Sequence, residues 1–360
     1  MAVKKLKVLV VGCGNMGASH ARAYNKIQGF DLIGIVSRTP SETRKKLANE
    51  LGGVPQFNDF DAALVSCKPD VVCVSSYTNT HKEFTIKSFK AGAHVFVEKP
   101  LAANISDAEE IVSLAKELNK KVVVGYILRQ HPAWIKFIDI AQGLGKPLVM
   151  RMNLNQQSSG LEWETHKHLM QTTSPIVDCG VHYVDVMCQM TKSKPVKVHA
   201  IGVKLTEEVK EGMYNYGQLQ VTFADGSVGW YESGWGPMMS ETAYFIKDVI
   251  GPKGSVSIAE QTISEETNSS TIDEHTKTNN LIVHYEELNN KGDFIKKDEI
   301  INTNDEPDHL ELCIREQQYL YDAIVNDSDL SSHLNDAVES LRIVLAADES
   351  IKTGTVVNLS

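Results

Sequence analysis

A short apolar run near the start of the chain leads directly into a glycine-rich turn, and this feature constrains the fold most. Residues 8–11 read Val-Leu-Val-Val, and Gly12, Gly14 and Gly17 follow with the spacing G-x-G-x-x-G. In such a turn the first glycine makes a tight bend, the second lets the backbone approach a pyrophosphate, and the third allows close helix–strand packing. The turn predicts dinucleotide binding, and a purely structural glycine turn is the alternative.

Apolar runs and amphipathic stretches alternate over the first 125 residues. Short apolar runs, typical of parallel strands covered on both faces, occur at 8–11, 32–36, 71–74, 95–97 and 122–124. Helical patterns lie between them at 17–28, 41–51, 80–91 and 106–119. Ser106 and Glu109 have the spacing of a capping box, which would open the last of these helices. The alternation predicts an α/β fold whose N-terminal domain, residues 1–125, is a doubly wound parallel Rossmann sheet.

The pattern changes from Tyr126 onward. Runs that alternate at period two indicate an antiparallel sheet with one face packed, and they occupy 148–154, 196–203 and 216–223. The pair Asp225-Gly226 predicts a hairpin turn, and a last helix is expected over about 334–352. Residues 126–360 therefore form the predicted second domain.

The charge of the chain argues against nucleic-acid and anionic-membrane partners. Lysine and arginine number 36 against 46 acidic residues, for a net charge of −10. Residues 260–311 hold 14 acidic residues and 4 lysines, which is also −10, so the rest of the chain is neutral and carries no basic excess. No apolar run approaches the roughly 20 residues that a membrane-spanning helix needs.

The six cysteines include no C-x-x-C pair, which predicts reduced thiols and a cytoplasmic location rather than a disulfide framework or a zinc site. His166 and His168 lie close to glutamates. No other ligands with suitable spacing accompany them, so no metal is expected.

The end of the second strand bears on the choice between NAD and NADP. An acidic residue at this point would bind the ribose 2′-hydroxyl and repel a 2′-phosphate. This chain has Ser37-Arg38 instead. A hydroxyl and a guanidinium favour NADP, while NAD with Arg38 stacked on the adenine is the alternative.

Two further motifs carry chemistry. Glu98-Lys99-Pro100 follows a predicted strand, and proline keeps Lys99 out of helical geometry at the carboxyl edge of the sheet. Ser174-Pro175 predicts a helix start, and the helix that follows places Asp178 and His182 four residues apart on one face. An aspartate beside a histidine suits proton transfer, whereas a satisfied core histidine is the alternative.

These motifs, taken in order, resemble the glucose-fructose oxidoreductase, inositol dehydrogenase and MocA family (Gfo/Idh/MocA). The resemblance covers nearly the whole chain. It rests on the glycine turn with His20 behind it, Pro69-Asp70, Thr78-Asn79-Thr80-His81, Ala91-Gly92-Ala93-His94, Glu98-Lys99-Pro100, Gly125-Tyr126 with Arg129 and Pro132, and Asp178-x-Gly180-x-His182-x-x-Asp185.

The resemblance implies a Rossmann domain followed by an α/β domain with a large open, mostly antiparallel sheet that pairs subunits into homo-oligomers. It also implies hydride transfer between a nicotinamide cofactor and a ring alcohol of a sugar, glycoside or cyclitol. His182 would act as general base, Lys99 would stabilise the alkoxide, and Asp178 would assist them.

The residues and the resemblance together suggest the ligand contacts, with residues 126–360 as the substrate-binding and oligomerisation domain. The cofactor would contact Gly12, Gly14, Asn15, Met16, Gly17, Ser37, Arg38, Ser75, Thr78, Asn79, His81, Glu98 and Lys99. The substrate would contact Lys99, Tyr126, Arg129, Trp163, Asp178 and His182. This chain departs from the family pattern at Ser37-Arg38 and in the polar insert 156–168, which contains Trp163. Trp163 and Trp235 have the chemistry to stack on a sugar ring, while packing within the protein is the role that prior odds favour.

Within this class, the expected reaction is oxidation of a glucoside or hexose at its third carbon. A keto-sugar reductase would use the same residues in reverse. An NAD-dependent glycosidase, which oxidises its substrate transiently and then eliminates the glycosidic bond, is a rival. A non-catalytic binding protein is a third hypothesis, which the presence of Lys99, Asp178 and His182 argues against.

Overall fold

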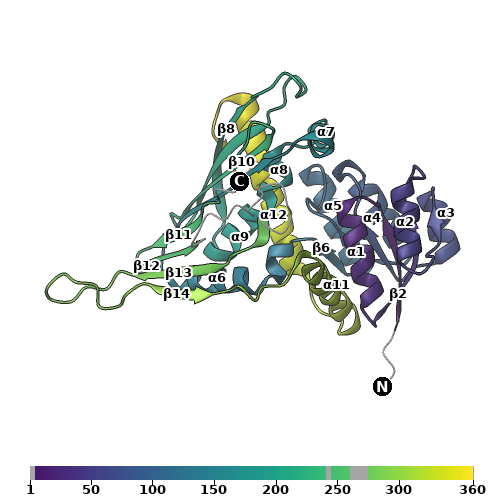
Figure 1. Ribbon diagram of the computed structural model, residues 1–360, viewed down its shortest axis with the longest axis horizontal. Coiled ribbons are helices and arrows are strands. Elements are labelled where there is room, and N and C mark those ends of the chain that lie inside the picture. Colours follow the sequence, from purple (N-terminus) through teal and green to yellow (C-terminus); the bar gives the residue numbers. More distant parts are fainter. Residues whose placement is uncertain (1–4, 241–244, 260–274, 360) are drawn as a thin grey trace. The chain divides into compact units, whose positions relative to one another are not determined.

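The computed structural model describes residues 5–240, 245–259 and 275–359, which form two compact units (Figure 1). One unit comprises Met1–Ile127 with Pro307–Val338, and the other Leu128–Glu306 with Glu339–Ser360. The sequence predicted a single boundary at 125/126. The structure instead assigns 307–338 to the first unit, because the helix α11 in this segment packs against α1.

The first unit is built on a six-stranded parallel sheet in the order β3-β2-β1-β4-β5-β6. This sheet confirms the predicted Rossmann fold. Its strands are β1 (Leu6–Val11), β2 (Phe30–Val36), β3 (Gln56–Phe57), β4 (Val71–Val74), β5 (His94–Val97) and β6 (Val122–Val124).

Helices connect these strands, as the alternating pattern predicts. They are α1 (Asn15–Lys26), α2 (Glu42–Glu50), α3 (Phe60–Cys67), the 3₁₀ turn η1 (Thr78–Thr80), α4 (His81–Lys90) and α5 (Ile105–Glu117). Helix α11 (His309–Val325) comes from the later segment of the unit and packs against α1. One detail is corrected: α5 is capped by Asn104, whose side chain accepts the Asp107 N–H at 2.9 Å, and not by Ser106. The helix begins at Ile105, so Ser106 already lies inside it.

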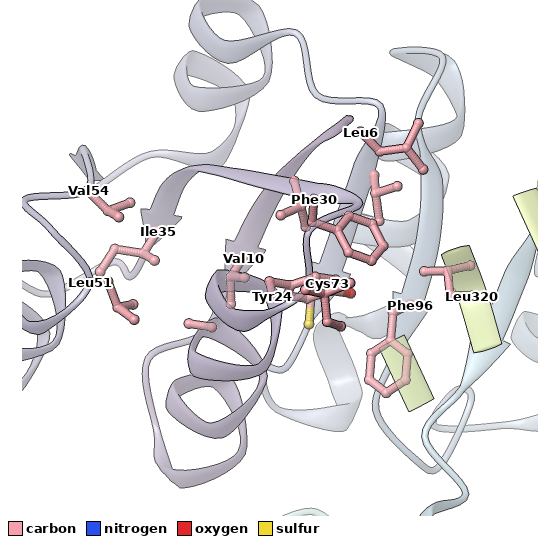
Figure 2. Close-up of a cluster of buried hydrophobic side chains, with 14 of the residues drawn as sticks. Leu6, Val10, Tyr24, Phe30, Ile35, Leu51, Val54, Cys73, Phe96 and Leu320 are labelled. Atoms are coloured by element: carbon pink, nitrogen blue, oxygen red, sulfur yellow. The ribbon is translucent and has the colours of Figure 1, made fainter. Parts of the chain in front are cut away.

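The core of the first unit joins both of its chain segments (Figure 2). Side chains from the sheet pack with Tyr24 of α1 and with Leu320 of α11. Helices α1 and α11 therefore contribute to one hydrophobic core, whose labelled members in Figure 2 are Leu6, Val10, Tyr24, Phe30, Ile35, Leu51, Val54, Cys73, Phe96 and Leu320.

The second unit is built on a nine-stranded sheet in the order β14-β13-β12-β11-β7-β10-β9-β8-β15. Every neighbouring pair is antiparallel except β7 and β10, which confirms a large, mostly antiparallel sheet. Its strands are β7 (Val149–Gln157), β8 (Pro195–Val203), β9 (Tyr216–Phe223), β10 (Val228–Gly236), β11 (Lys247–Gly251), β12 (Gly254–Ile258), β13 (Asn280–Tyr285), β14 (Glu299–Asn302) and β15 (Val357–Asn358).

The predicted hairpin turn is present between β9 and β10, where Gly226 has a φ of 83°. The helical elements of this part of the chain are η2 (Ile127–Gln130), α6 (Pro132–Gly143), α7 (Gly160–Leu169), α8 (Pro175–Asp178), α9 (Gly180–Thr191) and α12 (Ser331–Thr353), which begins in the first unit. No helix among the described residues combines the length and apolar character needed to cross a membrane.

The two faces of the nine-stranded sheet differ. Met150, Met152 and Tyr231 are fully buried on the face where α8 and α9 contact β10. On the opposite face Val228 and Ile250 both pair with Val149 across neighbouring strands, and all three side chains are exposed. The sheet therefore has one packed face and one face with exposed side chains, as its period-two pattern predicts.

Candidate active site

Four loops of the first unit are aligned at the carboxyl edge of the parallel sheet. The N–H groups of Ser75, Glu98 and Gly125 each continue the ladder by donating to the end of a neighbouring strand, at 2.8, 2.9 and 2.9 Å. Gly12 does the same with Val36 at 2.9 Å. The residues that follow β1, β4, β5 and β6 thus stand side by side at the edge where open α/β sheets bind ligands.

The three glycines of the turn have different surroundings. Gly12 has a φ of +97°, and a Cβ there would lie 2.1 Å from the Ser75 carbonyl oxygen. A Cβ on Gly17 would lie 2.0 Å from the Gly12 carbonyl oxygen, whereas a Cβ on Gly14 would meet no atom within 4 Å. Gly12 and Gly17 therefore allow the tight turn and the close packing of α1, and Gly14 leaves open space at the exposed N-terminus of that helix.

Arg44, which the sequence analysis missed, organises the end of β2. Its buried guanidinium donates to the carbonyl oxygens of Ser37 at 2.7 Å and Phe57 at 3.0 Å, and to the Gln56 side chain at 3.1 Å. Arg38 in the same loop is exposed. Of these two arginines, Arg44 holds the loop and Arg38 faces solvent. This difference could not be deduced from the sequence around them.

The loop after β4 carries Thr78 and Asn79, which are half-buried and exposed, and then His81. His81 is 1% exposed. Its Nδ1 lies 2.8 Å from the Pro100 carbonyl oxygen and its Nε2 lies 3.0 Å from that of Ser76. Burial lowers the pKa of His81, so the ring is neutral and donates one hydrogen bond, which we assign to the shorter contact. Both nitrogens face the backbone, which differs from the direct cofactor contact expected for this residue.

Glu98-Lys99-Pro100 follows β5 directly. The Glu98 carboxylate is buried: its Oε1 lies 2.5 Å from His20 Nε2, and its Oε2 accepts the backbone N–H of Lys99 at 3.3 Å. Lys99 itself is half-buried, and the bond to Pro100 is cis. The lysine is thus the partly exposed member of the motif, between two buried neighbours.

Asp178 and His182 lie in the second unit. Ser174 caps α8 by accepting the Val177 N–H at 3.1 Å, with proline next to it as the sequence predicts. The helix expected as one piece is divided at Cys179 into α8 and α9, although the backbone of Cys179 stays in the right-handed helical region. Asp178 and His182 are half-buried, so both side chains lie at the partly exposed side of α8 and α9.

His166 of α7 belongs to the same neighbourhood. Its ring stacks on Trp235 with centroids 4.5 Å apart, and its Nδ1 lies 2.9 Å from the Ser158 hydroxyl. Burial lowers the pKa of His166 to about 4, against the opposing effect of the Asp178 charge. The His166 imidazole is therefore neutral at pH 7, although the Asp178 charge acts in the opposite direction. The Trp235 ring on which it stacks is 1% exposed.

Three residues expected to line the substrate are engaged within the protein. Arg129 makes a two-point ion pair with the buried Asp185, at 2.5 and 2.8 Å. Trp163 is 5% exposed and its indole N–H donates to Glu208 at 3.3 Å, which favours the packing alternative for this ring. Tyr126 is 2% exposed and its ring lies 6.3 Å from that of His333 in an edge-on arrangement.

Comparisons with known proteins find relatives among the dehydrogenases. The chain is 28% identical over 194 residues to the UDP-N-acetylglucosamine 3-dehydrogenase of Acidithiobacillus ferrooxidans, which covers 54% of this chain and 57% of that protein. It is 29% identical over 196 residues to the D-glucoside 3-dehydrogenase of Escherichia coli, covering 51% and 54%. These matches span little more than half of each relative.

The fold likeness extends over the whole chain. A crystal structure of scyllo-inositol dehydrogenase from Lactobacillus casei with bound NAD(H) and scyllo-inositol covers 99% of both chains, with a TM-score of 0.75 at 22% identity. The model of an oxidoreductase family with an NAD-binding Rossmann fold matches residues 6–126, and that of the GFO/IDH/MocA C-terminal domain matches residues 140–257. Because these two models together span more than half of the chain, the protein belongs to the Gfo/Idh/MocA family of oxidoreductases.

Proposed function

We propose that this protein is an NAD(P)-dependent dehydrogenase that oxidises a ring secondary alcohol of a sugar, glycoside or cyclitol. The observation that carries the proposal is the alignment of the glycine turn with Glu98-Lys99-Pro100 at one sheet edge, in a chain of this oxidoreductase family. Two relatives are named as 3-dehydrogenases of a nucleotide sugar and of glucosides. These names support the third carbon of a glucoside as the oxidised position in this chain.

The turn fits a dinucleotide, because Gly14 leaves open space at a helix N-terminus, where backbone N–H groups favour phosphate. The residues that would hold it include Asn15 and Met16 in the first turn of α1, and Ser75, Thr78 and Asn79 after β4. When bound, the nicotinamide accepts a hydride from the ring carbon.

The protein's side chains then have to accept the hydroxyl proton and stabilise the negative charge on the alcohol oxygen. In the proposed mechanism His182 accepts the hydroxyl proton, Asp178 stabilises the imidazolium that results, and the Lys99 ammonium stabilises the developing alkoxide. Tyr126, Arg129 and Trp163 contribute to the substrate region by supporting its shape.

A Lys99→Met variant tests the proposal. Removing the ammonium takes away charge stabilisation of the alkoxide, so we expect kcat to fall at least a hundredfold, the range found when one such donor is lost. Dinucleotide affinity should be nearly unchanged. The measurement is the absorbance at 340 nm during oxidation of glucosides, hexoses and inositols, with nucleotide binding followed by fluorescence.

Lys90→Met, at an exposed lysine in the last turn of α4, is the matched control and should behave like the wild type. Full turnover in Lys99→Met would contradict the mechanism. Glycoside cleavage by the wild type without net formation of reduced nucleotide would show that the protein is an eliminative glycosidase and not a dehydrogenase.

We further propose that NADP is preferred. Support comes from the loop after β2, which has no carboxylate between Val36 and Pro40 and exposes the Arg38 guanidinium next to Ser37. Arg44 is not available for this role, because its guanidinium already donates to Ser37 in this loop and to Gln56 and Phe57 of β3.

Arg38→Asp should reverse the preference. A charge-assisted hydrogen bond contributes about 1.5–3 kcal/mol, so we expect the Kd for NADP to rise about tenfold to a hundredfold while the Kd for NAD stays level or falls. Lys46→Asp makes the same charge change at an exposed position of α2 and serves as control. A wild type that binds NAD more tightly than NADP would contradict the proposed NADP preference.

We also propose a cytoplasmic homo-oligomer. None of the six cysteines, all of which lie in the described residues, forms a disulfide, which supports a reducing compartment. Cell fractionation can check this location. The open sheet face supports pairing of two copies, because Val149, Val228 and Ile250 form an exposed apolar row on it. Val228→Lys should shift sedimentation toward the monomer, and a wild type that sediments as a monomer would refute the assembly.

A further inference from the structure

A buried chain of hydrogen bonds in the first unit runs from α11 through α1 to the end of β5. The Tyr24 hydroxyl donates to Gln317 Oε1, Gln317 Nε2 lies 3.0 Å from His20 Nδ1, and His20 Nε2 lies 2.5 Å from Glu98 Oε1. Tyr24, Gln317 and His20 are fully buried, and Glu98 is 7% exposed. Gln317 stands 297 positions from His20 in the sequence.

The hydrogen bonds from Tyr24 to Glu98 all run in the same donor-to-acceptor direction. The Gln317 amide uses its oxygen to accept from Tyr24, so its nitrogen donates to His20 Nδ1. The proton of a neutral His20 must then be on Nε2, which donates it to Glu98. Every donor therefore points toward the Glu98 carboxylate, which also accepts the backbone N–H of Lys99 at 3.3 Å.

Burial disfavours the charged forms of other titratable groups in this region. Burial and the charge of Glu98 raise the pKa of Glu316 well above its usual value, and burial also raises the pKa values of the Cys73 and Cys313 thiols. Ligand-type atoms of His20, Cys313 and Glu316 lie within 4.8 Å of one another, but both ring nitrogens of His20 already have partners, so we assign these atoms to the hydrogen-bonded region and not to a metal.

A second buried histidine acts on the other side of Lys99. His81 Nδ1 lies 2.8 Å from the carbonyl oxygen of Pro100, and His81 is 1% exposed. Glu98 and Pro100, the residues immediately before and after Lys99, are thus each held by a buried imidazole. The half-buried Lys99 side chain extends from a backbone that is fixed at both ends.

We propose that Tyr24, Gln317, His20 and Glu98, with His81 on the opposite side, are positioning residues that hold Lys99 in place for hydride transfer. This inference rests on the proposed function of Lys99. Its physical basis is that catalysis depends steeply on placement, and a shift of about 1 Å can cost about a hundredfold in rate. The C-terminal helix α11 would then affect catalysis without touching either ligand.

Gln317→Leu tests the proposal, because it removes both the acceptor for Tyr24 and the donor to His20 at nearly constant volume. We expect kcat to fall about tenfold to a hundredfold, with the nucleotide Kd within about twofold of wild type. Gln318→Leu is the matched control: it makes the same change one residue further along α11, where the amide donates to Asp322 at 2.9 Å. It should leave kcat unchanged.

Tyr24→Phe removes only the first hydroxyl and gives a second variant if Gln317→Leu does not fold; it should show a smaller loss of kcat at unchanged nucleotide affinity. An unchanged kcat in the folded variant overturns the proposal. So does a loss of kcat that is matched by loss of nucleotide binding and of melting temperature, because that pattern is purely structural.

Crystal structures of the wild type and Gln317→Leu separate this inference from the proposed function. If the wild type oxidises no sugar or cyclitol, the proposed function fails. The two structures then still show whether Gln317 fixes the position of Lys99. Displacement of Lys99 relative to Gly12 in the variant supports it, and superposition of Lys99 in the two structures overturns it.

Discussion

The buried carboxylate of Glu98 is the group on which the arrangement of the first unit depends. An ionised carboxyl taken out of water costs several kcal/mol unless hydrogen bonds compensate it. Here the compensation comes from His20 and from the Lys99 backbone, and His20 is in turn held by Gln317. Because Gln317 lies in residues 307–338, the C-terminal segment has to fold onto the Rossmann sheet, which accounts for a unit made of two separate stretches of chain.

The glycine turn makes this pairing possible. Close approach at Gly12 and Gly17 brings α1 against the sheet, with no room for a Cβ at either position. His20, three residues after Gly17 on the same helix, then reaches the carboxyl edge where Glu98 ends β5. A motif usually explained by phosphate binding therefore also sets the position of a side chain that supports the chemical end of the sheet.

Sequence periodicity predicted the local structure well, and for a physical reason. A strand such as β4 is a continuous apolar run because both of its faces are buried, and this pattern is visible within four residues. The glycine turn and Ser174-Pro175 are equally local, so their geometry follows from spacing alone. Local motifs also singled out Lys99, Asp178 and His182 as candidates, and the family resemblance added a catalytic role for each of them.

The contacts that sequence reasoning missed depend on residues far apart in the chain. Gln317 looks like any polar residue on an amphipathic helix, and its role appears only when α11 meets His20. Arg44 looks like a surface residue of α2 until its carbonyl acceptors at Ser37 and Phe57 are known. Trp163 was expected to stack on a sugar because aromatic rings do so, but the burial of its ring could not be deduced from its sequence neighbours.

Transfer of deuterium from a ring carbon to the cofactor tests the central claim most directly. Wild-type protein would be mixed with the oxidised nucleotide and with glucosides or inositols deuterated at single ring carbons, and the reduced nucleotide would be analysed by mass spectrometry. The account predicts that one labelled carbon, the third in a glucoside, adds one mass unit to the reduced nucleotide, and that Lys99→Met greatly slows this transfer. Reduced nucleotide without deuterium from any ring carbon, or no reduction with any of these alcohols, would contradict it.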